Sequence, residues 1–308
     1  MKVFISVNKQ FEDFLHGKTK VWYGDTEKLI KTFMQRGHDV ALVRPEETIL
    51  NKGFQNHYKL TEKGLMEVEG FIPDLFFVRG FGSDHNPKTS LDFFNTLISL
   101  ESEVPNIINQ GRSWFYEDKK KQKTLPLPFI PGYELKSVSD LHYLVKNERE
   151  GVIMKPSFGF QGAGVEYLSG KKDVDDIVQK INLTDENINN FVFEKFIPDK
   201  LETRYIYLYG EVIASRTVEK IGLPGKESYG EMRLNKNIDS FYKDVVKQVI
   251  DSTGRVYGSV DFRGGYVLET NSSGTGTIIS TSGSNRFGKP LLDLTDRIVE
   301  TIERKLEK

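Results

Sequence analysis

The first 43 residues alternate between strand-like and helix-like hydrophobic patterns, and this alternation constrains the fold more than any other feature of the sequence. An apolar run at residues 3–7 is followed by apolar residues at helical spacing from Leu29 to Met34, by Gly37, and by a second apolar run at residues 40–43. Strand, helix and strand at such short spacing are typical of a βαβ unit, which requires a parallel sheet. We therefore predict an α/β domain with a parallel sheet over residues 1–122.

Residues 125–131 mark the start of a different pattern. They include Pro126, Pro128 and Pro131 and so cannot continue a helix. Short strand-like runs follow in quick succession, and Tyr209-Gly210 is typical of a tight turn between two of them. The pattern favours an α+β region with largely antiparallel strands over residues 123–308, with helices near residues 174–181, 238–252 and 291–306.

The composition is that of a soluble globular chain. Hydrophobic residues account for 38% and charged residues for 28% of the 308 residues, which fits neither a disordered nor a membrane protein. Forty-three basic residues balance 44 acidic ones, so no global charge draws the chain to nucleic acid or anionic lipid. The absence of cysteine excludes disulfides and cysteine nucleophiles, and the N-terminus lacks a signal-peptide pattern. We expect a cytoplasmic protein without a nucleic-acid or membrane partner.

A glycine-rich stretch follows the strand-like run at residues 152–155. Lys155 ends that run, and Gly159, Gly162 and Gly164 come next. Backbone amides of such a loop can cradle phosphate oxygens, and a lysine at its mouth adds a positive charge. The GxxGxG spacing matches neither the dinucleotide-binding fingerprint nor the P-loop. A flexible hairpin loop without a ligand is the alternative that this segment leaves open.

Two acidic residues and an asparagine surround a predicted Gly264-Gly265 turn. The turn places Asp261 and Glu269 on neighbouring strands, and Glu269 and Asn271, two residues apart, share one face. Carboxylate and amide oxygens are the ligands that Mg²⁺ prefers. The sequence therefore indicates a magnesium site, with an ordinary exposed acidic strand as the alternative.

An apolar strand at residues 191–193 leads into Glu194, Lys195, Phe196 and Ile197. Its backbone could bind the edge of an adenine base, and Phe196 and Ile197 could form apolar walls around it. The alternative is a core strand that ends in a surface ion pair.

Taken in the order in which they occur along the chain, the three segments resemble the ATP-grasp superfamily, particularly its glutathione-synthetase-like and glutamate-adding carboxylate-amine ligase branch. The resemblance implies an α/β N-terminal domain of the pre-ATP-grasp type, residues 1–122, followed by an ATP-grasp fold of two subdomains. These would be a small lid-like subdomain over about 123–195 and a metal-binding C-terminal subdomain over about 196–308, both with largely antiparallel sheets.

The resemblance also implies roles for individual residues. Lys155 and the glycines 159, 162 and 164 would contact the phosphates of ATP, residues 194–197 the adenine, and Glu202 the ribose. The metal ligands would be Asp261, Glu269 and Asn271. Lys119, after Asp118, is similar to the first nucleotide-binding lysine of the family, with Lys120 and Lys123 as alternatives. As a group, the lysines at 119–121 and 123 are expected to form a solvated patch.

Two arginines compete for a position near the transferred phosphoryl group. Arg233 is similar to the family's arginine and is our first choice, and Arg216 is the second. For both, the alternative is a surface arginine paired with a carboxylate.

The implied activity is that of an ADP-forming carboxylate-amine ligase. With Mg²⁺, or Mn²⁺ in its place, ATP would convert a carboxylate to an acyl phosphate, which an amine then attacks to form an amide or peptide bond. The acceptor would be an amino acid, a peptide or another small molecule, and a homo-oligomer is compatible with this activity. A small-molecule kinase and a non-catalytic ATP-binding regulatory module are the alternatives, and the complete acidic set disfavours the module.

Overall fold

The computed structural model describes residues 1–7, 9–16, 18, 24–44, 57–62, 64–78, 92, 95–99, 101–158, 164–224, 227–271, 278–280 and 290–307. Among these residues, no helix is both long and apolar enough to span a bilayer.

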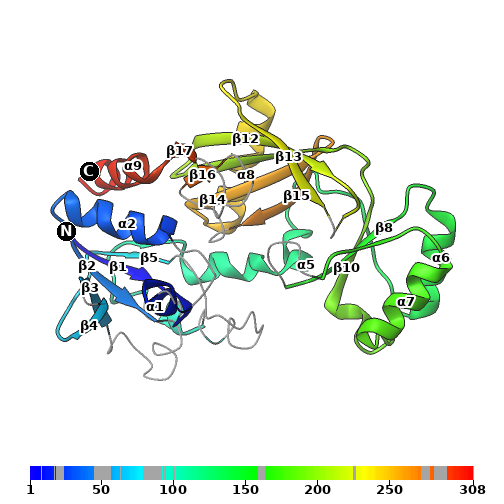
Figure 1. The fold of residues 1–308 in the computed structure, drawn as a ribbon, viewed down its shortest axis with the longest axis horizontal. Helices are drawn as coiled ribbons and strands as arrows, with labels where there is room; N and C mark the ends of the chain where they lie inside the picture. The colour runs from blue at the N-terminus through cyan, green and yellow to red at the C-terminus, as the bar shows by residue number, and fades with distance from the viewer. Residues whose placement is uncertain are drawn as a thin grey trace.

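The N-terminal domain is built on a sheet with the strand order β4-β3-β2-β1-β5-β6 (Figure 1). Its parallel part consists of β1 (Lys2–Ser6), β2 (Asp39–Val43), β5 (Leu75–Phe77) and β6 (Ile107–Ile108). The prediction of a parallel α/β sheet is thus confirmed. An antiparallel hairpin of β3 (His57–Thr61) and β4 (Gly64–Val68) extends one edge, which makes the complete sheet mixed.

Alternate residues of β1 enter different hydrophobic clusters. Val3 and Ile5 pack with Leu29 and Phe33 of α2 (Gly24–Gln35), whereas Phe4 packs with Phe76 and other residues of a second cluster. Helix α1 (Lys9–Leu15) follows β1 and contributes Phe11 to the first cluster. Of the apolar residues whose spacing predicted a helix after β1, Leu29, Ile30 and Phe33 form the buried face of α2, whereas Met34 is exposed.

The small subdomain contains an antiparallel sheet with the order β7-β10-β8-β9. Its strands are β7 (Gly132–Tyr133), β8 (Val152–Pro156), β9 (Glu166–Leu168) and β10 (Phe191–Lys195). Helices α6 (Val138–Asn147) and α7 (Lys171–Ile181) lie beside this sheet, at the right of Figure 1, and the short helix η2 (Ile188–Asn190) precedes β10.

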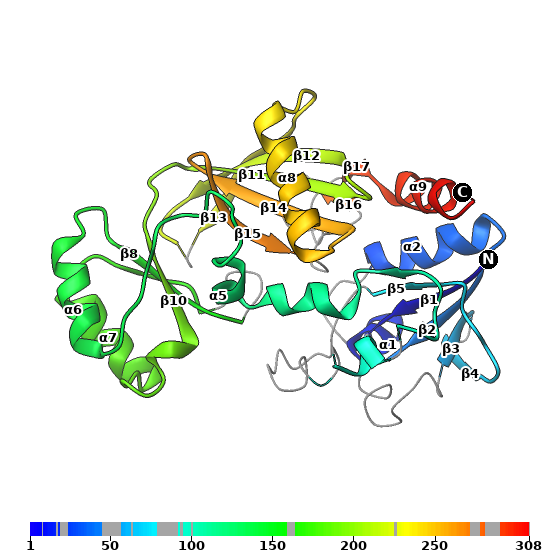
Figure 2. The ribbon, with the colours of Figure 1, turned by 180° about the vertical axis from the view of Figure 1, so that it is seen from behind.

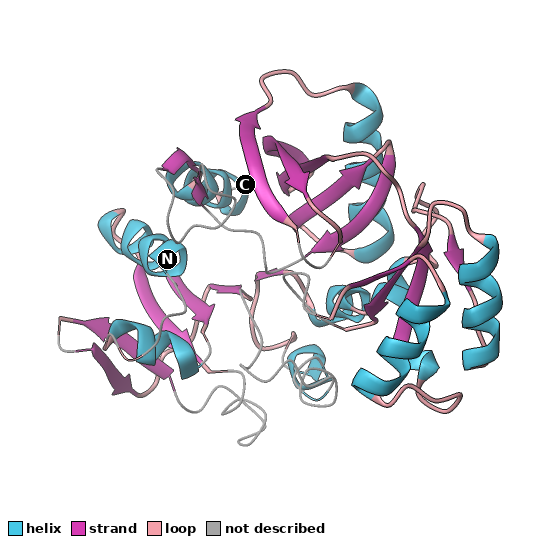
Figure 3. Cartoon of the chain, turned by 45° about the vertical axis from the view of Figure 1, so that its right-hand side comes forward, coloured by secondary structure: helices cyan, strands magenta, loops and turns pink. Residues whose placement is uncertain are grey.

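The large sheet is antiparallel and has the order β13-β12-β11-β14-β15. Its strands are β11 (Leu201–Leu208), β12 (Glu211–Ile221), β13 (Ser228–Leu234), β14 (Tyr257–Arg263) and β15 (Tyr266–Asn271). Helix α8 (Ser240–Thr253) covers one face, as Figure 3 shows. Gly264 and Gly265 join β14 to β15 with φ values of +57° and +81°, a conformation that favours glycine.

Two short elements connect the N-terminal domain to the rest of the molecule. The 3-10 helix η1 (Gly111–Glu117) leads directly into α5 (Lys119–Gln122), and the Asp118 side chain caps α5 by accepting a hydrogen bond from the backbone of Lys120. In Figure 2 this connection runs below the large sheet toward the small subdomain.

The C-terminal part of the chain returns to the N-terminal domain. After the hairpin of β16 (Ile278–Ser280) and β17 (Pro290–Asp293), helix α9 (Thr295–Leu306) packs against α2 (Figure 1). Ile298 and Ile302 of α9 belong to the same hydrophobic cluster as Leu29 of α2 and Ile206 of β11. One core therefore joins the N-terminal domain to the large sheet, and α9 lies at their junction.

Candidate active site

A row of charged side chains crosses the large sheet at one level. Arg216 of β12 is paired with Arg204 of β11, Arg204 with Asp261 of β14, and Asp261 with Glu269 of β15. Residues directly opposite each other in neighbouring strands point to the same face. Two arginines and two carboxylates therefore lie side by side on one face of this sheet.

Arg204 holds Asp261 through both carboxylate oxygens. Its Nε and a terminal nitrogen each lie 2.6 Å from one oxygen of Asp261, the bidentate geometry of a strong ion pair. Asp261 is almost completely buried. Burial raises the pKa of Asp261, while the Arg204 charge opposes this shift. Arg204 was not among the predicted site residues, because its pairing with Asp261 depends on a strand register between residues 57 positions apart.

The predicted metal ligands converge. Asn271 Nδ2 lies 3.1 Å from Oε1 of Glu269 and 3.4 Å from Oδ2 of Asp261. Burial would raise the pKa of Glu269, but the charges of Lys119 and Lys155 and the hydrogen bond from Asn271 together lower it. A half turn of the Asn271 amide would direct its oxygen to the same point.

This donor set fits Mg²⁺, because it offers hard oxygen ligands around one point. Two carboxylates and one amide supply those oxygens. The described residues contain no group of three or more His, Cys, Asp or Glu side chains arranged to hold a metal. Mg²⁺ is commonly bound by one or two carboxylates, with water and substrate phosphates completing its shell.

Two lysines enclose Glu194, the first residue of the predicted adenine-binding segment. Lys155 Nζ lies 2.7 Å from one carboxylate oxygen of Glu194, and Lys123 Nζ lies 2.5 Å from the other. Lys155 Nζ is also 3.5 Å from the carbonyl oxygen of Leu268 in β15. Lys155 therefore lies between the small sheet and the strand that carries Glu269.

Lys119 is buried rather than part of a solvated patch. Only 8% of its surface is exposed, because α5 packs between β15 and the end of β8. Burial lowers the pKa of Lys119, and the attraction of Glu269 offsets this shift only in part. Burial likewise lowers the pKa of Lys123, which the sequence analysis named only as an alternative to Lys119. The expectation of a solvated lysine patch is thus wrong for Lys119, which helical packing removes from water.

The rest of the predicted nucleotide-binding segment lies at the end of β10. The Lys195 and Phe196 backbone amides donate hydrogen bonds to the carbonyl oxygens of Pro131 and Gly151, and the Phe196 ring contacts that of Tyr167. Ile197 approaches the turn between β14 and β15, since a Cβ on Gly264 would lie 2.7 Å from its methyl carbon. This segment therefore links the small sheet to the hairpin of β14 and β15, which carries the predicted metal ligands.

Glu202 lies on the same face as Arg204, two residues before it in β11. Its Oε2 is 3.1 Å from a guanidinium nitrogen of Arg263 and 3.5 Å from Nζ of Lys220. An acidic group held by two cations near the start of β11 is suited to accept hydrogen bonds from hydroxyl groups of a ligand.

The two candidate arginines lie on different faces of the large sheet. Arg216 is paired with Leu234 of β13, whereas Arg233 is paired with Thr217, the next residue of β12. Consecutive residues of a strand point to opposite faces. The structure thus brings Arg216, and not Arg233, into the row with Asp261 and Glu269.

The predicted phosphate-binding loop is described only in part. Gly159 and Gly162 lie outside the described residues. Gly164 has a φ of +72°, and a Cβ there would lie 2.8 Å from the Pro156 ring at the end of β8. Gly164 therefore closes the loop tightly against the strand that carries Lys155.

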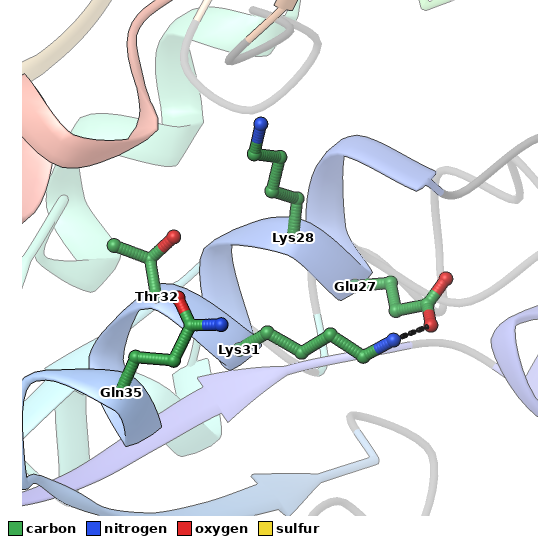
Figure 4. A pocket seen from close by; sticks show the side chains of 5 residues that line it. All are labelled: Glu27, Lys28, Lys31, Thr32 and Gln35. Atoms are coloured by element: carbon green, nitrogen blue, oxygen red, sulfur yellow. Dashed lines mark hydrogen bonds and ion pairs between the residues drawn. The ribbon is translucent and has the colours of Figure 1, made fainter.

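A pocket of about 320 Å³ lies elsewhere, along α2 (Figure 4). Its lining residues are Glu27, Lys28, Lys31, Thr32 and Gln35, and all of them come from this one helix. Lys31 and Glu27 form an ion pair with each other at 2.5 Å. The pocket shares no residue with the row on the large sheet, and we assign it no role.

No protein-family model and no curated protein matches the sequence. Solved structures, in contrast, match nearly the whole chain. The ATP-grasp ligase PsnB, complexed with a phosphomimetic variant of its minimal precursor, Mg and ADP, has a TM-score of 0.67 at 13% identity, covering 99% of this chain and 98% of PsnB. D-alanine–D-alanine ligase from Bacillus anthracis, complexed with ATP, has a TM-score of 0.63 at 12% identity, covering 100% of this chain and 97% of the ligase.

The macrocyclase MdnC from Microcystis aeruginosa MRC, bound with precursor peptide MdnA, has a TM-score of 0.60 at 13% identity, covering 89% of this chain and 92% of MdnC. At such low identities these likenesses establish the fold. The chain has an ATP-grasp fold, and the fold class predicted from the sequence is confirmed.

Proposed function

We propose that this chain is an ATP-dependent ligase that activates a carboxylate as an acyl phosphate and joins it to an amine. The observation that carries the proposal is the convergence of Lys119, Lys155, Asp261 and Glu269 from α5, β8, β14 and β15. Lys119, Lys155 and Asp261 are buried and Glu269 is half-buried. Cations that face carboxylates in this way are what a site for a metal-bound polyphosphate requires.

The nucleotide would lie between the small and the large sheet. Lys119 and Lys155 would contact its phosphates, residues 194–197 its adenine and Glu202 its ribose. Lys155 would exchange part of its contact with Glu194 for the phosphates. Asp261, Glu269 and Asn271 would hold Mg²⁺, which when bound would neutralise charge on the phosphates.

Arg216 is our choice for the residue that contacts the transferred phosphoryl group. It lies next to Arg204, whose charge is taken up by Asp261. Burial and the repulsion of Arg204 lower the pKa of Arg216 to about 10, so it is still a cation at neutral pH. Within the described part of the chain, no carboxylate lies within ion-pairing distance of Arg216. A cation in this situation favours the arrival of an anion.

Amino acids and peptides are the substrate classes that we propose to screen first. Support comes from the molecules bound in the similar solved structures, which include precursor peptides for PsnB and MdnC. D-alanine–D-alanine ligase and the D-cycloserine synthetase DcsG extend the range to amino acids and small molecules. These likenesses also favour the ligase over a kinase that would use the same nucleotide site.

The reaction class is tested by trapping. Amino acids, short peptides and small acids are first screened for release of ADP in the presence of Mg²⁺ and ATP. Hydroxylamine is then added with the active carboxylate, because an acyl phosphate reacts with it to give a hydroxamate and free phosphate. A hydroxamate is the expected product. A stable phosphorylated alcohol without free phosphate would instead identify a kinase.

A further inference from the structure

Gln122, a buried residue of α5, attaches the segment η1–α5 to β15, the strand of the proposed metal ligands. Gln122 is 3% exposed, and its amide contacts both backbone polar groups of Thr270. The Thr270 N–H donates to Oε1 of Gln122, and Nε2 of Gln122 donates to the Thr270 carbonyl oxygen, each over 2.9 Å. The same Nε2 lies 2.7 Å from the carbonyl oxygen of Tyr116 in η1.

This attachment completes the edge of the large sheet. β15 is the last strand in the sheet order, so backbone groups on its outer side lack a strand partner. Further along the same edge, residues 128–130 pair with Val267 through two backbone hydrogen bonds. At Thr270 the amide of Gln122 takes the place of a neighbouring peptide group.

A buried arginine, Arg255, also connects β15 to this segment. Arg255 is fully buried, and its guanidinium donates to Oγ1 of Thr270 at 2.9 Å and to the carbonyl oxygen of Ser113 at 3.1 Å. It also lies 3.0 Å from the carboxylate of Glu117. Arg255 therefore ties β15 to η1, while Gln122 ties β15 to α5.

Thr270 stands between two predicted metal ligands, and Gln122 stands one helical turn after Lys119. Residues three apart in a helix lie on neighbouring surface positions. The peptide of Thr270 sets the directions of Glu269 and Asn271, and α5 sets the direction of Lys119. The attraction between the charges of Lys119 and Glu269 therefore depends on how α5 is aligned with β15.

We infer that Gln122 is a positioning residue, which aligns α5 with β15 so that Lys119 lies opposite Glu269 in the nucleotide site. Arg255 supports this alignment through its contacts with Thr270, Ser113 and Glu117. The inference rests on the proposed nucleotide-binding function, and it assigns Gln122 no direct contact with the nucleotide.

The test is a double-mutant cycle on nucleotide binding, with AMPPNP and Mg²⁺ titrated calorimetrically into the full chain. The variants are Gln122→Ala, Lys119→Ala and the double substitution, and Lys121→Ala is the matched control, since it is an exposed residue of the same helix. Gln122→Ala should weaken binding about tenfold, the scale of losses seen for residues that orient a site. The control should change binding less than twofold.

The cycle separates positioning from packing. If Gln122 acts through Lys119, the Gln122→Ala loss disappears when Lys119 is already alanine, so the double variant binds like Lys119→Ala. If Gln122 only stabilises the fold, the two losses multiply, which would overturn the inference. Should Gln122→Ala fail to fold, Gln122→Glu replaces it, because it keeps the volume and the acceptor for the Thr270 N–H but loses both donated hydrogen bonds.

Binding of AMPPNP by the parent protein tests the proposed function separately from the role of Gln122. A parent that does not bind AMPPNP overturns the proposed function and the inference with it. A parent that binds, with multiplying losses in the cycle, overturns the inference alone.

Discussion

At the scale of single residues, the site is a balance of buried charges. Arg204 and Asp261 neutralise each other, Glu269 is ionised beside two lysines, and Arg216 lacks a carboxylate partner among the described residues. Leaving a half-buried cation without a counter-ion is costly, so the retention of Arg216 points to a ligand that supplies the negative charge. This arrangement leads to two predictions.

The first prediction compares the two candidate arginines. Arg216→Ala should lower turnover roughly 100-fold, the scale of losing one group that stabilises developing charge. Arg233→Ala should lower it only a few-fold, since Arg233 points to the opposite face of the sheet. ADP release with the cognate carboxylate measures both. The reverse order of effects would return the phosphoryl-contacting role to Arg233.

The second prediction concerns proton uptake. The pKa values of Lys119 and Lys123 are lowered in the free protein, mainly by burial. A bound polyphosphate favours the charged form and raises these values, so binding takes up protons at pH values between the free and bound pKa. Titrating AMPPNP in buffers of different ionisation enthalpy should show uptake that grows as the pH is raised into the alkaline range. Lys119→Ala should reduce it, and proton release there would contradict the charge assignments.

At the scale of elements, part of the site was predictable from sequence because it is local. The Gly264-Gly265 turn places Asp261 and Glu269 on neighbouring strands, which was predictable. Their direct pairing was not, because it depends on a shift in the register of β14 and β15 between Asp261 and Phe262. The position of Arg204 was also not predictable, because β11 and β14 are neighbours in the sheet but are separated along the chain by β12, β13 and α8. The burial of Lys119 was not predictable either. A run of lysines ordinarily stays exposed to water, and only the packing of α5 removes Lys119 from it.

The close approach of β14 and β15 leads to a prediction at Gly258. A Cβ there would lie 2.4 Å from the carbonyl oxygen of Asn271 and 2.8 Å from the Tyr207 hydroxyl. Gly258→Ala should therefore lower the free energy of unfolding by about 1–3 kcal/mol and displace Asn271. Urea denaturation measures the loss. Gly170→Ala is the control, because a Cβ there meets nothing within 4 Å. Equal stabilities of the two variants would contradict this prediction, because they would show that β15 can shift to accommodate the added methyl group at little cost.

At the scale of the whole molecule, α9 closes the structure by returning to the N-terminal domain. The sequence predicted a C-terminal helix over residues 291–306 from its apolar spacing, and α9 occupies Thr295–Leu306. Its packing partner α2 lies more than 250 residues away along the chain, as the bond between Arg36 and Glu303, 267 positions apart, illustrates. Periodicity gives the buried face of a helix, but it does not identify the surface that covers that face.

Because α9 packs at the junction of the N-terminal domain and the large sheet, we expect Ile302→Ala to have a large effect on the free energy of unfolding. Ile302 is fully buried in the cluster that joins α9, α2 and the large sheet. Its truncation should lower the free energy of unfolding by about 2–5 kcal/mol, measured by urea denaturation. Arg304→Ala on the exposed side of the helix should change it by less than about 0.5 kcal/mol. A small effect of Ile302→Ala would mean that α9 does not stabilise the junction.

We propose that Glu269 and its surrounding cations form a Mg²⁺-dependent nucleotide site. The decisive measurement is calorimetric titration of AMPPNP into the parent, with Mg²⁺ and with EDTA, alongside Glu269→Gln and the exposed control Glu186→Gln. We expect binding by the parent and by Glu186→Gln that depends on Mg²⁺, and a loss of at least about tenfold in Glu269→Gln. Mg²⁺-independent binding, or equal binding by Glu269→Gln and the parent, would contradict it.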